Sequence, residues 1–290
     1  WTAAIEADPN CLEAWQARAR FYLAKGENDK AISDLKKLIG ANRDDVIARF
    51  ALVEALAGLK KFDEALAELD KVIEVRPEVP MGYLMRARIL LLKREPDKAI
   101  AALDQALEAE PRDLNALLMR AQLHLEADRF DQARTDINRV LQLQPGLIQA
   151  IVLRASLAAA EKKYGEAIGD LRKLIKEDGD NTAVHLQIAQ LYVAGGWPRQ
   201  AIKLITRVIE KTPADGEPWL ALRARGDAYL NIGMHAEAIA DFEKALKAKP
   251  DDQGILNNLA WVLATSPDEK IRNAQRAIEL GKHACEVTDY

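Results

Sequence analysis

The sequence predicts an all-α solenoid built from one helical hairpin that is repeated along the chain. Alanines recur at intervals of 34, 34, 34, 34, 34, 37 and 39 residues, and these anchor alanines are Ala31, Ala65, Ala99, Ala133, Ala167, Ala201, Ala238 and Ala277. Apolar residues follow at steps of three and four, which is typical of amphipathic helices. Strand-like alternation is missing. A period of this length indicates stacked units that each contact only their neighbours.

Each unit keeps the same small and large positions around its anchor. Twelve residues before the anchors stand Ala19, Val53, Ala87, Ala121, Ala155, Ala189 and Gly226, and Ala260 takes this place in the last unit, whose turn is five residues longer. Four residues after the anchors stand Leu35, Leu69, Leu103, Ile137, Leu171, Ile205 and Phe242, with Gly281 in the last unit. Small residues allow two helices to approach closely, and large ones fill the space between them. We therefore expect a first and a second helix of about a dozen residues in each unit.

Proline marks the end of most second helices. Twelve residues after the anchor, five units carry Pro77, Pro111, Pro145, Pro213 and Pro250. Proline has no N–H group and disfavours helical backbone in the residue before it, so it stops a helix. Arg43 and Gly179 take this place in two other units. The 37-residue interval predicts an insertion of three residues near 214–218.

A two-helix unit of 34 residues resembles the tetratricopeptide repeat (TPR). The best matches run from Ala14 to Arg43 and from Gly226 to Pro250. We predict a single array over residues 1–290, with the end of a truncated repeat at 1–11 and repeats at about 12–45, 46–79, 80–113, 114–147, 148–181, 182–215, 219–252 and 253–290. The incomplete first unit and the missing polar cap at the end predict a fragment of a longer protein. The resemblance implies a right-handed superhelix whose first helices line the concave side.

Charged residues also keep the period. Arg18, Arg86, Arg120, Arg154 and Arg225 stand thirteen residues before their anchors, and Asp34, Asp136, Asp170 and Asp241 stand three residues after. In the unit anchored at Ala201 both places are apolar, with Ile188 and Leu204. Arg86 is the exception, since Ala102 holds the expected Asp place. The arginines could form a row of ligand contacts, but paired presence and joint absence favour a structural ion pair between the two helices.

Composition and motifs argue against catalysis. The formal charge is −4, which gives no field that would favour nucleic acid. Apolar runs are far shorter than the roughly 20 residues of a membrane span, so no membrane insertion is expected. Cys11 and Cys285 stand too far apart in the chain for a cysteine-based metal cluster. No phosphate-binding loop or hydrolase motif occurs, and the four histidines fall in four units. We predict no enzyme, cofactor or metal.

A stripe on the first helices, one residue after the core stripe, is the predicted binding groove. The predicted groove residues are Arg20, Phe50, Leu84, Arg88, Leu91, Leu118, Gln122, Leu125, Val152, Leu186, Gln190, Val193, Arg223, Asp227 and Trp261. Its centre, with Met81 and Leu92 added, would form a continuous apolar trough if the side chains are exposed; the alternative is that they pack against neighbouring helices. Exposed apolar strips usually mark binding surfaces.

The favoured function is a non-catalytic scaffold that binds a protein or peptide partner in this groove. Two alternatives stay open. One is a regulatory or targeting arm of a larger enzyme, and the other is a self-assembling array that associates through the ends of the repeat array. Some members of the family hold acidic peptides through a basic clamp, but Arg20, Arg88 and Arg223 are isolated here, which disfavours that role. The sequence leaves the compartment undecided.

Overall fold

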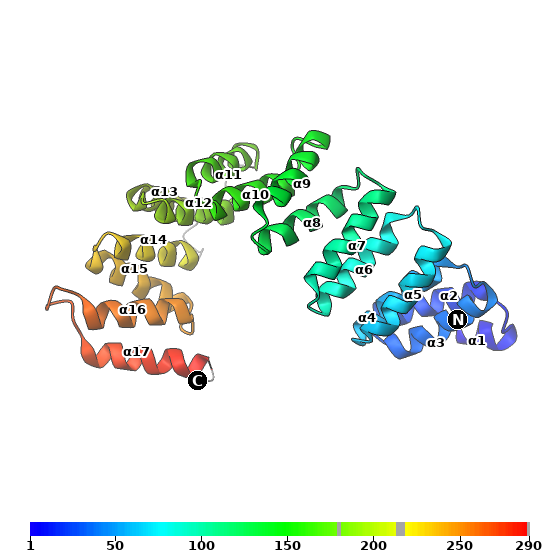
Figure 1. Ribbon diagram of the computed structural model, residues 1–290. Coiled ribbons are helices and arrows are strands. Elements are labelled where there is room, and N and C mark those ends of the chain that lie inside the picture. Colours follow the sequence, from blue (N-terminus) through cyan, green and yellow to red (C-terminus); the bar gives the residue numbers. More distant parts are fainter. Residues whose placement is uncertain (179–180, 213–217, 289–290) are drawn as a thin grey trace. The chain divides into compact units, whose positions relative to one another are not determined.

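The computed structural model describes residues 1–178, 181–212 and 218–288, and for 176–178 only the backbone. In these ranges it contains seventeen α-helices and no strand, which confirms the predicted all-α solenoid. The chain divides into two compact units, Trp1–Ala150 and Ile151–Tyr290. Figure 1 shows that consecutive helices within each unit lie side by side as antiparallel pairs. The superhelical twist and the single continuous array stay predictions.

In the first unit, the helix α1 (Thr2–Ala7) precedes four hairpins. The first helices are α2 (Leu12–Ala24), α4 (Val46–Gly58), α6 (Pro80–Leu92) and α8 (Leu114–Glu126), and the second helices are α3 (Asn28–Ala41), α5 (Phe62–Val75), α7 (Pro96–Ala109) and α9 (Phe130–Leu143). Each has 13 or 14 residues apart from α1, as the period requires.

The second unit repeats the pattern. Its helices are α10 (Ile148–Ala160), which begins shortly before the boundary, α11 (Tyr164–Asp178), α12 (Thr182–Ala194), α13 (Pro198–Lys211), α14 (Trp219–Asn231), α15 (His235–Ala248), α16 (Gln253–Thr265) and α17 (Ala274–Val287). The five extra residues of the last hairpin lie in the turn between α16 and α17. There Ser266 is buried, and its Oγ lies 2.9 Å from Nδ1 of His235.

The small positions lie where the two helices of a hairpin cross. All eight anchor alanines are buried, and so are the alanines that face them from the first helices α2, α6, α8 and α12. Gly226 shows why small size matters, because a Cβ atom added there would lie 2.6 Å from the ring of Phe242. In this hairpin the large Phe242 ring thus packs against a glycine, whereas in other hairpins a leucine or isoleucine packs against an alanine.

The turns inside the hairpins share one backbone conformation. Five residues before the anchor, seven hairpins have a residue with positive φ, namely Gly26, Lys60, Arg94, Asp128, Lys162, Gly196 and Gly233. The next N–H group donates to the carbonyl five residues earlier, as from Lys61 to Leu56 and from Arg129 to His124. This pairing is the Schellman motif, which ends a helix with a left-handed residue. Four of the seven are not glycine and therefore carry backbone strain.

The prolines end the second helices as predicted in the described residues. Helix α5 ends at Val75, two residues before Pro77, and α7, α9 and α15 end at the same distance from Pro111, Pro145 and Pro250. Pro213, Gly179 and most of the insertion near 214–218 lie outside the described residues.

Candidate peptide-binding faces

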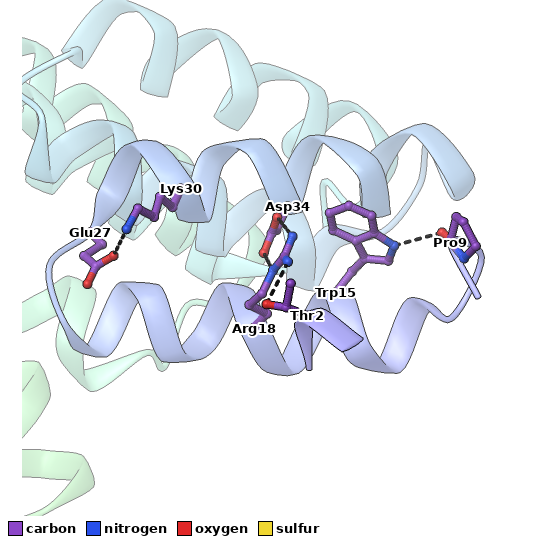
Figure 2. A network of polar contacts seen from close by, with 7 residues as sticks. All are labelled: Thr2, Pro9, Trp15, Arg18, Glu27, Lys30 and Asp34. Carbon is purple, nitrogen blue, oxygen red and sulfur yellow. Dashed lines mark hydrogen bonds and ion pairs between the residues drawn. The ribbon is translucent and has the colours of Figure 1, made fainter. Parts of the chain in front are cut away.

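The arginine and aspartate pairs are ion pairs that join the two helices of a hairpin. Nε and Nη2 of each arginine donate to the two carboxylate oxygens of the aspartate sixteen residues later, at 2.6–2.9 Å, in the pairs Arg18–Asp34, Arg120–Asp136, Arg154–Asp170 and Arg225–Asp241. Figure 2 shows this geometry for Arg18 on α2 and Asp34 on α3. The four aspartates are buried. The structural interpretation of these residues is therefore confirmed.

Several of these arginines also reach back to the preceding hairpin. Nη1 of Arg120 donates to Asp104 on α7 at 2.6 Å, and Arg86 pairs with Asp70 on α5. The hydrogen bonds that Arg120 donates to Asp136 raise the pKa of the Arg120 guanidinium against the effect of burial. Arginine suits this position because its planar fork binds two carboxylates at once. One side chain thus joins three helices.

The hairpin α4–α5 contains an ion pair that the sequence analysis missed. Glu68 occupies the usual Asp place, but the usual Arg place holds Leu52, and Arg49 one turn earlier donates to Glu68 at 2.5 Å. Arg49 is buried and also donates to the carbonyl of Arg43, which stands in the terminal proline place. A search of the sequence for Asp or Glu at the Asp place, together with a cation within one helical turn of the Arg place, would have found the pair.

Apolar pairs replace the ion pair in two hairpins. Ile188 on α12 is buried and Leu204 on α13 is half-buried, and in the last hairpin Leu259 and Leu280 are both buried. In these two hairpins apolar side chains therefore take the place of the charged pair.

The predicted groove residues of the first unit differ in exposure. Arg20, Arg88 and Gln122 are exposed, whereas Phe50, Leu91, Leu118 and Leu125 are half-buried. Phe50 and Leu91 pack against the cores of their hairpins, and Leu118 packs against the cluster of Leu117, Val140 and Ala150. Leu84 is a correction, because it is only 2% exposed and belongs to the core around Ala87 and Leu103. Met81 and Leu92, at 45% and 59% exposed, supply apolar surface instead.

The second unit contains a hollow on its first helices. It has a volume of about 160 Å³ and lies between α10 and α12, lined by Val152, Ala155, Ser156, Ala159, Leu171, Gln187, Gln190 and Leu191. Two predicted groove residues, Val152 and Gln190, therefore come together here. Leu186 and Val193 are half-buried on α12 and pack against the core around Ala189 and Ile205.

The remaining groove residues lie on α14 and α16. Nη1 of Arg223 donates to both carboxylate oxygens of Asp252, at 3.0 and 3.1 Å, so this arginine joins α14 to the start of α16. Nδ2 of Asn258 donates to Oδ1 of Asp227 at 2.7 Å, and burial raises the pKa of the Asp227 carboxyl. Trp261 is 55% exposed. The sequence analysis missed Asn258.

Three of the four histidines have polar partners. His124 is buried on α8, where burial lowers its pKa, and among the described residues its Nδ1 has no hydrogen-bond partner. Nδ1 of His185 lies 2.8 Å from the carbonyl of Asn181, and Nε2 of His283 lies 2.8 Å from Asp251. In the described ranges, no group of three or more His, Cys, Asp or Glu is arranged to hold a metal ion. Across the same residues, the helices lack the combined length and apolarity of a membrane span.

Comparison with protein families identifies the repeats. Models described as tetratricopeptide repeat match residues 23–89 and 158–226, residues 84–148, and residues 219–252. The chain belongs to the tetratricopeptide repeat family. No protein of curated function matches the chain by sequence.

Solved structures share the fold at low sequence identity. A tetratricopeptide repeat protein from Parabacteroides merdae has a TM-score of 0.62 at 20% identity, over 87% of this chain and 98% of that one. A chain of the APC/C hetero-tetramer Cut9–Hcn1 has a TM-score of 0.53 at 13% identity, over 99% of this chain and 56% of that one. The MamA fragment from residue 41 onward, from Desulfovibrio magneticus, has a TM-score of 0.51 at 18% identity, over 59% of this chain and 98% of that one. These likenesses support the fold alone.

The fold places the protein among interaction scaffolds in a general sense. Tetratricopeptide repeats generally bind protein partners, and the fold is typically non-catalytic. In the described residues, the four period-keeping arginine–aspartate pairs are used for contacts between helices.

Proposed function

We propose that this protein is a non-catalytic scaffold that binds a peptide or a segment of a partner protein along its first helices. The observation that carries the proposal is the hollow of the second unit, because two residues predicted from the period line it together with other first-helix residues of α10 and α12. Small concave sites with apolar walls and a few amide groups suit a peptide side chain.

The first unit adds apolar surface of its own. Met81 and Leu92 are exposed, and Leu118 and Leu125 are accessible in part. Exposed arginine and glutamine side chains, Arg88 and Gln122, lie in the same stripe and supply polar contacts at its edge. An apolar strip with a polar rim is the anatomy of many protein-binding surfaces.

Variants on the two helix faces test the proposal. The protein is immobilised, and bound partners are quantified by mass spectrometry for the wild type, for Leu118→Asp with Leu125→Asp, for Ser156→Trp, and for the charge change Arg88→Glu. The matched control is Asn138→Asp with Gln142→Asp, which places the same number of charges on exposed positions of the second helix α9.

We expect the first-helix variants to lose partners that the control retains, with unchanged helicity by circular dichroism. Arg88 and Ser156 are exposed, so their variants keep the test valid if the leucine variant unfolds. Equal recovery of partners by all variants would contradict the proposal.

Self-association is a second candidate because α17 exposes apolar side chains. Ile278, one residue after the last anchor, is 55% exposed, whereas Ile100 and Ile168 at the equivalent place are buried. Light scattering at several concentrations should show association for the wild type that Ile278→Asp abolishes. Concentration-independent monomer in the wild type would eliminate this candidate.

A further inference from the structure

We propose that the α14–α16 face of the second unit binds a lysine or arginine side chain of the partner peptide. This inference rests on the proposed function and deepens it, because it names the chemistry that one part of the groove recognises. Its occupant is a cationic side chain of a peptide, which would be complementary to the charge of Asp227 and would lie beside the amide of Asn258 and the indole of Trp261.

The first step is the charge balance of the face. Within the described ranges, Arg223 is the cation that acts on Asp227, and Asp252 is a second carboxylate beside it. That guanidinium binds both oxygens of Asp252, whose Oδ1 also accepts a hydrogen bond from the backbone N–H of Ile255 at the start of α16. One negative charge is therefore left uncompensated, and it lies at Asp227.

The second step is the surroundings of Asp227. Its carboxylate is half-buried, and in the described part of the chain its hydrogen bond comes from the neutral amide of Asn258, with no ion pair. A half-buried carboxylate without a cation is costly, which agrees with the raised pKa. A ligand cation next to Asp227 would supply the missing charge.

The third step is the exposed indole. Trp261 follows Asn258 by one helical turn on α16, and residues three apart lie on the same face of a helix. Its side chain is 55% exposed, although a large aromatic ring normally gains by burial. Indole faces attract ammonium and guanidinium groups. Asp227 is held by the amide of Asn258, and the indole of Trp261 lies one turn further along α16. Together they form a site for an alkyl chain that ends in a cation.

The same unit predicts the neighbouring part of the ligand. Val152, Ala159 and Leu191 give the hollow between α10 and α12 mainly apolar walls. We therefore expect peptides that combine apolar residues with a lysine or arginine, and we expect acidic peptides to be rejected by Asp227.

The test selects peptides from a random dodecapeptide library displayed on phage, with the full chain as bait. Baits are the wild type, Asp227→Asn, Trp261→Ala and, as a matched control, Glu243→Gln. Asp227→Asn keeps the shape and the oxygen that accepts from Asn258. Glu243 is an exposed carboxylate on the second helix α15 of the same unit. Circular dichroism verifies that each bait is folded.

We expect lysine and arginine to be enriched among peptides from the wild type and from Glu243→Gln, and to lose that enrichment with Asp227→Asn. In a selected peptide, replacing the basic residue by norleucine should weaken wild-type binding about tenfold. The same replacement should have no effect on Asp227→Asn. Trp261→Ala should weaken the basic peptide about threefold, as expected for a partly exposed cation–π contact.

The outcomes separate the two proposals. Peptides without basic enrichment that lose binding in Ser156→Trp would overturn this inference and leave the proposed function intact. Selected peptides that bind all first-helix variants equally would overturn the proposed function. A selection that yields no binding peptide would count against both.

Discussion

The hairpins α8–α9 and α12–α13 solve the same packing problem with opposite chemistry. In α8–α9 the helices are joined by Arg120 and Asp136 through two hydrogen bonds of 2.8 and 2.6 Å. In α12–α13 the equivalent residues are Ile188 and Leu204. The comparison teaches that the position selects matched partners rather than a residue type. In these two hairpins a buried carboxylate has its cation, and an aliphatic residue has another aliphatic residue.

The most damaging change should be the loss of one member of the ion pair. Asp136→Ala leaves the Arg120 guanidinium without its main partner, so we expect the free energy of unfolding of this hairpin to fall by about 3–5 kcal/mol. Hydrogen exchange of α8 and α9 measures this locally, which matters because repeat arrays can unfold in parts. Leu204→Ala in α12–α13 is the matched control. Protection of α8 and α9 equal to that of the wild type would contradict the structural role of the pair.

A second comparison concerns the glycine in α14–α15. Gly226→Ala inserts a methyl group where the ring of Phe242 would lie 2.6 Å away, so we expect a loss of about 1–3 kcal/mol from overpacking. Combining Gly226→Ala with Phe242→Leu recreates the alanine and leucine of other hairpins and should recover most of the loss. Urea unfolding followed by circular dichroism gives both values. A single variant as stable as the wild type would show that the close approach is unimportant.

The turns provide a smaller effect of opposite sign. Lys162 has a φ of 61°, whereas the equivalent residue before α13 is Gly196. Because glycine adopts positive φ without steric cost, Lys162→Gly should stabilise the α10–α11 hairpin by about 0.5–1 kcal/mol, and Gly196→Ala should destabilise α12–α13 by a similar amount. Thermal unfolding midpoints of the two variants should move in opposite directions. Movement in the same direction would refute the role assigned to the turns.

The smallest expected effect is a pH dependence confined to α8–α9. Burial lowers the pKa of His124 below its usual 6.5, with Arg120 and Arg129 acting in the same direction and Asp136 and Asp104 opposing. Below about pH 6.5 the unfolded state therefore binds more protons than the folded state. The contribution of His124 to the free energy of unfolding is fully present at neutral pH and falls as the pH is lowered from 7 towards 5. Unfolding midpoints against pH should be flatter in His124→Phe, which carries an aromatic ring like Tyr192 at the equivalent place of α12. Identical pH profiles would eliminate this contribution.

Much of the architecture follows from the sequence because each hairpin contacts mainly its neighbours. The period fixes the separation of Arg18 from Asp34, so the pairing of their side chains could be predicted without coordinates. The buried anchors and the helix ends before Pro77 and Pro111 follow in the same way. These features depend on local spacing, which the chain repeats.

Exposure on the first helices was less predictable. Leu84 occupies the groove register but is buried, while Met81 one turn earlier is exposed, because exposure depends on how the neighbouring helices cover each side chain. The network of Arg223, Asp252, Asp227 and Asn258 joins residues about thirty apart on adjacent hairpins, which a search within single units does not find. The groove itself stays a prediction that binding experiments must test.

The coupling energy between Arg120 and Asp136 tests the central claim most directly, namely that the repeated charges join helices rather than bind ligand. It is obtained from a double-mutant cycle of the wild type, Asp136→Ala, Arg120→Leu and the double variant, with hydrogen exchange of α8 and α9 as the measurement. We predict that the double variant recovers part of the loss of Asp136→Ala, with a residual deficit from the lost contact with Asp104. Strictly additive effects of the two substitutions would contradict the account.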